Sequence, residues 1–186
     1  CDDLRPEYDH EIIEKWIEGE TGFPFLDACM KFLNENGWIN FRMRAMIMSF
    51  ASYNLWQPWQ KTSPRLAELF TDYEPGIHIS QVQMQSGVTG INLPRIYSIA
   101  KQSMDQDPDA VWTKNLLPQL KDFDPKLIHN AELNASYIPQ IVDLKTSAKF
   151  ARDQVWGIRK SIEFKNEARK VYLKHGSRRK RYTKTS

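Results

Sequence analysis

The chain has 186 residues, of which 41% are hydrophobic and 12% aromatic, and its formal net charge at pH 7 is +3. This composition is typical of one globular domain with a sizeable core and excludes a disordered chain. The longest apolar run, residues 45–51, is too short to cross a bilayer, and the acidic N-terminus has no signal-peptide pattern. We therefore expect a cytoplasmic protein with no membrane partner. Because the chain begins with Cys1 and not with Met, we also expect it to be a piece of a longer protein.

Metal and disulfide chemistry find little support in the residue pattern. The two cysteines, Cys1 and Cys29, form no CxxC pair, and the four histidines are scattered without metal-ligand spacing. We expect no metal site within this chain.

The charge is unevenly distributed. The segment KHGSRRKRYTKTS, from Lys174 onward, holds six Lys or Arg and no acidic residue, which leaves 20 basic and 23 acidic residues elsewhere. Such a basic tail is typical of a solvated end, and it can also add non-specific attraction to phosphates.

Helix signals follow one another along the chain. Asp9 is a candidate cap for a helix that ends near Gly19, and Pro24 begins a second helix that stops at Gly37. A third helix is expected at about residues 40–55. The pattern then predicts a short helix beginning at Ser63-Pro64, followed by helices at about 76–86, 108–116 and 126–131. The fold class is therefore predicted to be all-α.

The last predicted element is a long amphipathic helix at residues 146–174. Its expected apolar face comprises Phe150, Val155, Ile158, Ile162, Phe164, Ala168 and Tyr172. The expected organisation is a helical domain at residues 1–145, this helix at 146–174 as part of the same domain, and a basic tail at 175–186.

Two arginines interrupt the apolar helix at residues 40–55. Burying an unpaired arginine is costly, so Arg42 and Arg44 need either partners or a route to solvent. Residues two apart on a helix point in directions about 200° apart, so the two side chains cannot serve one purpose together. Both could reach the surface with their stems on apolar neighbours, or one could meet an internal carboxylate.

A candidate carboxylate lies in the Gly- and Pro-punctuated segment at residues 71–97. Asp72 and Glu74 precede Pro75-Gly76, where helix capping would explain them. The alternative is that Asp72 is the partner of Arg44 in a charge-assisted pair. Alternating polar residues in the same segment suit the lining of a polar cavity.

Short motifs in this chain resemble, in order, those of the flavin-binding helical domain of the photolyase/cryptochrome family. The motif W-x-x-G-x-T-G-x-P-x-x-D-A is matched by Trp16, Gly19, Thr21, Gly22, Pro24, Asp27 and Ala28. The motif G-W-x-x-x-R-x-R is matched by Gly37, Trp38, Arg42 and Arg44, and the acidic pair of a D-x-D motif by Asp72 and Glu74. Further matches are Ser49, Phe50 and Trp59, then Thr89, Gly90, Asn92, Arg95, Ile96 and Tyr97, then Asp107, Pro108 and Asp109, and finally residues 139–143. The resemblance covers about residues 16–143.

The resemblance implies an FAD cofactor and a domain that is incomplete on its N-terminal side. The implied cofactor-binding residues are Trp38, Arg44, Asp72, Tyr73, Glu74 and His78. Arg44 would pair with Asp72 beside the flavin, and His78 would lie opposite the flavin N5. The family's phosphate-gripping loop and its α/β antenna domain would lie before this chain.

The resemblance also implies a deoxyribodipyrimidine photo-lyase, which repairs pyrimidine dimers in DNA by light-driven electron transfer. The implied DNA-binding residues are Phe41, Arg42, Met43, Arg95 and Gln102. Trp59 and His78 are the implied catalytic residues, with Trp59 at the middle tryptophan of the electron-transfer chain; packing in the core is the other interpretation of Trp59.

Four residues depart from the pattern of repairing members. His78 replaces an asparagine, Val82 the flavin-proximal tryptophan, Met84 an aromatic that stacks on the lesion, and Phe41 a polar residue. These departures favour a second hypothesis, a cryptochrome-like photoreceptor that uses the same pocket to signal. A helical interaction module without flavin is a third.

Overall fold

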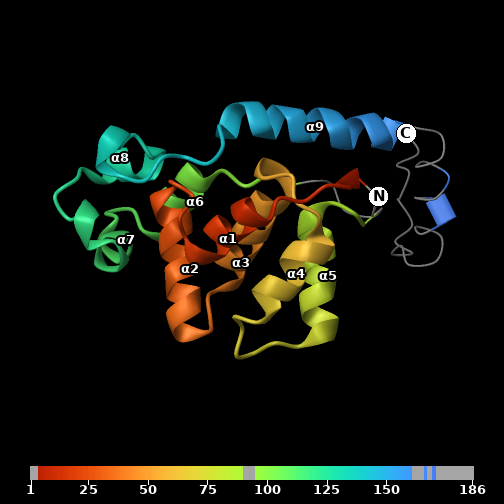
Figure 1. The fold of residues 1–186 in the computed structure, drawn as a ribbon, viewed down its shortest axis with the longest axis horizontal. Coiled ribbons are helices and arrows are strands. Elements are labelled where there is room, and N and C mark those ends of the chain that lie inside the picture. Colours follow the sequence, from red (N-terminus) through yellow and green to blue (C-terminus); the bar gives the residue numbers. More distant parts are fainter. Residues whose placement is uncertain (1–3, 90–94, 161–165, 167–168, 171–186) are drawn as a thin grey trace, which may run out of the picture.

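The computed structural model describes residues 4–89, 95–160, 166 and 169–170, and within this part the chain forms helices and no strands (Figure 1). The elements are α1 (His10–Glu18), α2 (Pro24–Asn36), α3 (Phe41–Ser49), a π-helical turn η2 (Phe50–Asn54), α4 (Trp59–Ala67), α5 (Pro75–Ser86), α6 (Ile99–Gln106), α7 (Val111–Leu116), η3 (Pro118–Leu120), α8 (Pro125–Asn130), η4 (Asn134–Ser136) and α9 (Leu144–Lys160). The predicted all-α class is confirmed. None of the described helices is both long and apolar enough to cross a membrane.

The first two helices begin and end where the sequence predicts. The Asp9 side chain accepts a hydrogen bond from the Ile12 amide at 3.2 Å, and Gly19 follows α1 in the left-handed conformation. Pro24 occupies the first turn of α2, and Gly37, with φ of 69°, ends it. These two helices contribute many of the buried side chains of the main core, among them Trp16, which is fully buried.

The third predicted helix is divided. Asn40 caps α3, which ends at Ser49, and the chain then widens into the π-helical turn, where the Leu55 amide donates to the Phe50 carbonyl. The expectation of a helix buried on most of its surface is wrong for the first turn, because Phe41 and Arg42 are exposed. It is confirmed from Ala45 onward.

Two other helix boundaries differ from the prediction, and one helix was missed. Helix α4 begins at Trp59, and Pro64 lies inside it. Helix α6 was not predicted at all. Helix α7 begins at Val111 and not at residue 108, because the Asp107 carboxylate accepts hydrogen bonds from the amides of Trp112 and Thr113, at 3.1 and 2.8 Å, and so fixes the first turn there.

Helix α9 lies across one end of the bundle, against η2 (Figure 1). Ala151 and Val155 are its buried residues, so Val155 is on the inner face as predicted. Phe150 is 47% exposed, but its ring packs edge-to-face on that of Trp56, with 5.1 Å between the ring centres. Most of residues 161–174, the matched Gly90 and Asn92, and the tail at 175–186 lie outside the described residues.

A buried arginine near the start of the chain joins the ends of two helices. Arg5 donates from Nε to the Ser52 carbonyl at 2.6 Å and from Nη2 to the Ser86 carbonyl at 3.1 Å. Ser52 belongs to η2, in the last turn of the α3–η2 helix, and Ser86 is the last residue of α5. The negative ends of two helix dipoles therefore surround a cation that is only 3% exposed, and its guanidinium stacks 4.5 Å from the centre of the Trp56 ring.

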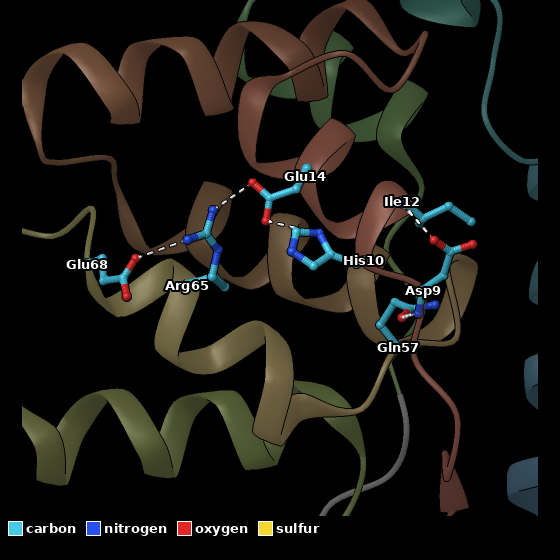
Figure 2. Close-up of polar contacts among 7 residues, drawn as sticks. All are labelled: Asp9, His10, Ile12, Glu14, Gln57, Arg65 and Glu68. Atoms are coloured by element: carbon cyan, nitrogen blue, oxygen red, sulfur yellow. Dashed lines mark hydrogen bonds and ion pairs between the residues drawn. The ribbon is translucent and has the colours of Figure 1, made fainter.

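Polar contacts fasten α1 to α4 (Figure 2). Arg65 on α4 pairs with Glu14 on α1 at 2.7 Å and with Glu68 at 3.4 Å. The Gln57 side chain accepts a hydrogen bond from the Asp9 amide at 2.8 Å. These contacts fix how α4 is placed relative to the core.

Candidate functional site

A pocket of about 340 Å³ opens between α3 and α5, with Leu66 of α4 and the segment after α4 completing it. All six residues predicted to bind the cofactor line this pocket: Trp38, Arg44, Asp72, Tyr73, Glu74 and His78. Its apolar lining includes Ile39, Phe41, Ala45, Met48, Leu66, Phe70, Ile77 and Val82. The structure thus brings together residues that are up to 44 positions apart in the sequence.

Arg44 lies on the wall of the pocket, and its guanidinium donates hydrogen bonds to Ile39 and Asp72. Its Nη2 donates to both carboxylate oxygens of Asp72, at 3.0 and 2.8 Å, and its Nε donates to the Ile39 carbonyl at 2.8 Å. The guanidinium carbon also lies 4.1 Å from the centre of the Phe70 ring. The predicted Arg44–Asp72 pair is therefore present, and it fixes both the charge and the orientation of a cation beside the pocket.

Glu74 caps the helix that forms the opposite wall. Its carboxylate accepts a hydrogen bond from the Ile77 amide at 2.7 Å, and Pro75 follows in the first turn of α5. The capping interpretation of Glu74 is confirmed, while Asp72 pairs with Arg44 instead. The helix predicted at about 76–86 is present as α5, and one face of it supplies part of the expected cavity lining.

His78 lies on that face, half-buried among aromatic rings. Its Nε2 is 3.1 Å from both the carbonyl and the hydroxyl oxygen of Ser63, and its ring centre is 5.3 Å from that of Tyr73. Burial lowers the pKa of His78 below its ordinary value of 6.5, and the charge of Arg44 acts in the same direction. The imidazole is therefore mostly neutral at pH 7 and available for hydrogen bonding or proton exchange at the pocket.

Two glutamines of the lining, Gln81 and Gln85, were among the alternating polar residues of segment 71–97 that were expected to line a polar cavity. Gln81 and Gln85 follow His78 at positions i+3 and i+7, which places all three on one face of α5. The side-chain oxygen of Gln81 is buried and has no hydrogen-bond partner among the described residues. Their expected place in a cavity lining is confirmed, although the sequence had assigned them no role toward the cofactor.

The lining of the pocket suits part of a flavin. A pocket of this size is at the small end of the range for ligand sites, about 300–1,000 Å³, and can hold a ring system more readily than a whole dinucleotide. A flavin ring is planar, mostly apolar and carries an N–H donor and carbonyl acceptors on its edge. The apolar walls, the orphaned oxygen of Gln81 and the cation of Arg44 match those needs. The residues present therefore fit the implied cofactor.

The other predicted residues lie outside the pocket lining, except Phe41. Arg42 and Arg95 are exposed and Met43 is half-buried, whereas Gln102 is only 8% exposed. Trp59 is partly buried against the main core at the start of α4. In the part of the chain that the structure describes, no group of three or more His, Cys, Asp or Glu residues could hold a metal ion.

The sequence model of the FAD binding domain of DNA photolyase matches residues 2–157. The fold and the pocket thus define a flavin-binding helical domain, and the chain belongs to the photolyase/cryptochrome family. The predicted family, fold type and FAD cofactor are confirmed.

Several relatives are similar over much of this chain. A "Cryptochrome DASH" of Gloeobacter violaceus is 29% identical over 78% of this chain and 32% of its own length. A "Deoxyribodipyrimidine photo-lyase" of Alkalihalophilus pseudofirmus is 29% identical over 68% of this chain and 27% of its own length. The "Cryptochrome DASH, chloroplastic/mitochondrial" of Oryza sativa subsp. japonica is 33% identical over 74% and 23%, respectively. The chain therefore spans about a third or less of the length of these relatives.

Solved structures show the same arrangement of helices. An archaeal photolyase from Sulfolobus tokodaii, determined with two FAD molecules, aligns with a TM-score of 0.75 and 28% identity, over 81% of this chain and 36% of that one. A cryptochrome from Synechocystis sp. PCC6803 aligns with a TM-score of 0.74 and 25% identity, over 79% and 33%.

Proposed function

We propose that this chain is the C-terminal part of the FAD-binding domain of a deoxyribodipyrimidine photo-lyase that repairs pyrimidine dimers in DNA. The observation that carries the proposal is the ion pair of Arg44 and Asp72 on the wall of an apolar pocket that suits a flavin. The similarity to relatives named deoxyribodipyrimidine photo-lyase supports it. The parent protein would also carry an N-terminal antenna domain.

In this proposal the residues of the chain position the cofactor and the lesion. When bound, reduced FAD supplies an electron to the dimer under blue light. Arg44 and Asp72 orient the edge of the ring, and the neutral imidazole of His78 exchanges a proton or donates a hydrogen bond there. Trp38 and Phe41 are 51% and 55% exposed at the rim, where a dimer flipped out of the duplex would meet them.

DNA contacts are assigned to the exposed cations. Arg42 and Arg95 would contact phosphates, which fix the orientation of the protein without reading the sequence. Met43 would border the cleft. The burial of Gln102 leaves little of its side chain for DNA, so that assignment is the weakest of the DNA-binding set.

The electron-transfer role of Trp59 remains a prediction. Val82, which lines the pocket, stands where a tryptophan would connect the flavin to Trp59. If flavin photoreduction in the full-length parent is unchanged in Trp59→Phe, the route through Trp59 is wrong.

A cryptochrome-like photoreceptor is the second candidate function. It is favoured by the replacements at His78, Val82, Met84 and Phe41, and by relatives named cryptochrome DASH. In that case the same pocket would bind FAD and light would change the interactions of the protein.

Exposure of a dimer-containing oligonucleotide to the full-length parent, under blue light and in the dark, separates the two functions. Photo-lyase activity predicts loss of dimers in the light alone. Light-dependent changes in the flavin absorbance without any loss of dimers would contradict repair and favour the photoreceptor. Arg42→Ala is expected to weaken binding to damaged DNA and to reduce the salt slope of binding by about 0.9, the value for one phosphate contact.

A further inference from the structure

Charge is divided sharply between two parts of this chain. Residues 144–186 contain 14 basic and 3 acidic residues, a net charge of +11, whereas residues 1–143 contain 12 basic and 20 acidic residues, a net charge of −8. The boundary falls at the start of α9, which itself carries five Lys or Arg and one Asp. A block of this charge favours a polyanionic partner.

The cations of α9 are arranged in a stripe. Lys145, Lys149, Arg152, Trp156 and Arg159, here called the α9 stripe, follow one another at alternating spacings of four and three residues. At 100° per residue they fall within an arc of about 80°, and they extend over about 21 Å of helix. The stripe therefore presents four cations and one aromatic ring on one side of α9, apart from its buried residues Ala151 and Val155.

The middle of the stripe is exposed, and its two cations, Lys149 and Arg152, form no ion pair within the part of the chain that the structure describes. Trp156 is 45% exposed, and the guanidinium of Arg159 lies 6.0 Å from the centre of its ring. A large aromatic ring held among cations is an arrangement that suits stacking on a nucleic-acid base.

A hollow of about 180 Å³ lies beside the stripe, lined by Tyr53, Ile96, Ala151, Arg152, Val155 and Trp156. Tyr53 is 1% exposed, and its hydroxyl has no hydrogen-bond partner among the described residues. The exposed Arg95 is adjacent to Ile96 in the chain. The hollow thus adds a lining of mixed polarity, including the unpaired hydroxyl of Tyr53, next to the cations.

We propose that the α9 stripe binds single-stranded nucleic acid, with Lys149 and Arg152 on phosphates and Trp156 stacked on a base. This surface is separate from the flavin pocket, to which α9 contributes no residue, and its action requires neither flavin nor light. A membrane surface is the less suitable partner. Ala151 and Val155 are buried, and the exposed Phe150 and Trp156 lie about 120° apart around α9, so they form no continuous apolar face to enter a bilayer.

The test measures binding of an undamaged, fluorescently labelled 12-nucleotide oligothymidine to the full-length protein in the dark, by anisotropy at several salt concentrations. The double variant Lys149→Gln/Arg152→Gln should reduce the salt slope by about 1.4, the value for two phosphate contacts on a single strand. Trp156→Ala should weaken binding at least about fivefold, and Trp156→Phe should retain most of the affinity because its ring still stacks. These side chains are exposed, so the variants are expected to fold.

The matched control is Lys121→Gln/Lys126→Gln, which removes the same charge from exposed positions near α8 and leaves the basic tail unchanged. Its salt slope should equal that of the parent. An equal reduction of the salt slope in the two double variants would contradict binding by the α9 stripe. Equal affinity of the protein for a duplex of the same length would contradict a preference for single strands. Stripe variants that lose binding to phosphatidylserine vesicles but not to the oligonucleotide would show a membrane surface instead. None of these outcomes affects dimer repair, which is measured separately with damaged DNA in the light.

Discussion

Two arginines in one short helix have different surroundings. Arg44 donates three hydrogen bonds within the protein and lies against Phe70, whereas Arg42, two residues earlier, is exposed. The angle of about 200° between them explains the difference, since only one of the two can point into the molecule. The residue pattern left both helix capping and pairing with Arg44 open for Asp72, and the family resemblance favoured the pair that the structure shows.

Asp72→Asn is expected to separate stability from cofactor binding. The ion pair is partly exposed, 27% for Arg44 and 48% for Asp72, so its loss should lower the free energy of unfolding by less than about 1 kcal/mol. Flavin retention should fall more clearly, because the guanidinium loses its fixed orientation. The ratio of flavin to protein absorbance in the purified full-length parent measures this. Glu68→Gln, which removes a partner of Arg65 outside the pocket, should retain flavin; equal retention in both variants would contradict the role of Asp72.

His78 is expected to make stability depend on pH. Because burial lowers its pKa in the folded protein, the unfolded state binds more protons as the pH falls below about 6.5, its ordinary pKa. The contribution of neutral His78 is therefore complete above pH 6.5 and is lost as the pH falls through the lowered pKa. Between pH 7.5 and 5.0, the urea midpoint should fall further in the parent than in His78→Gln. Parallel decreases would show that His78 does not contribute.

At the scale of elements, local sequence signals predicted where helices end, but they did not predict where a helix changes from α-helical to π-helical geometry. Asp9, Pro24 and Gly37 act through contacts with their own neighbours, so their effects could be read from the sequence. The π-helical turn at Phe50–Asn54 depends instead on packing around it and has no local signal. Pro64 was predicted to lie in the first turn of a helix, because proline is common there. Helix α4 begins earlier, directly after Pro58, so Pro64 lies inside it.

Two glycines are expected to respond oppositely to replacement by alanine. Gly22 has a φ of 84°, and a Cβ there would lie 2.6 Å from backbone atoms of Pro139 and Gln140, so Gly22→Ala should cost about 2 kcal/mol or more. Gly157 lies in α9 with open space around it, and Gly157→Ala should increase stability by about 1 kcal/mol. Urea unfolding of both variants tests this. A stabilising Gly22→Ala would mean that residues 139–140 do not pack on this turn.

At the scale of the molecule, the residues of the pocket were easier to predict than the burial of residues elsewhere in the fold. The six pocket residues belong to three segments with recognisable motifs, so their assembly followed from the family resemblance. Burial of Gln102, and of Arg5 against two helix ends, depends on how distant elements meet, which a single sequence does not specify. Gln81 and Gln85 were expected to line a cavity, but the cavity that they face is set by the packing of α5 against α3.

The pocket predicts how this chain should discriminate between flavins. Its volume and lining suit the ring, so riboflavin and FAD are expected to bind the isolated chain with dissociation constants within about tenfold of each other. Quenching of flavin fluorescence by the nearby Tyr73 and Trp38 measures both affinities. A preference for FAD well above tenfold would show that these residues also hold its adenosine half.

Arg5 lies outside the pocket lining, yet its position has a consequence for flavin binding. The two helices that it joins, α3–η2 and α5, are also the two walls between which the flavin would lie, so one buried cation helps to set the width of the gap. Burial lowers the pKa of Arg5 only to about 10, so this constraint persists at every physiological pH. Arg5→Met should therefore lower the affinity for flavin, although residue 5 does not line the pocket. Flavin affinity in this domain then depends partly on the distance between two helix ends, which the buried side chain of Arg5 holds constant.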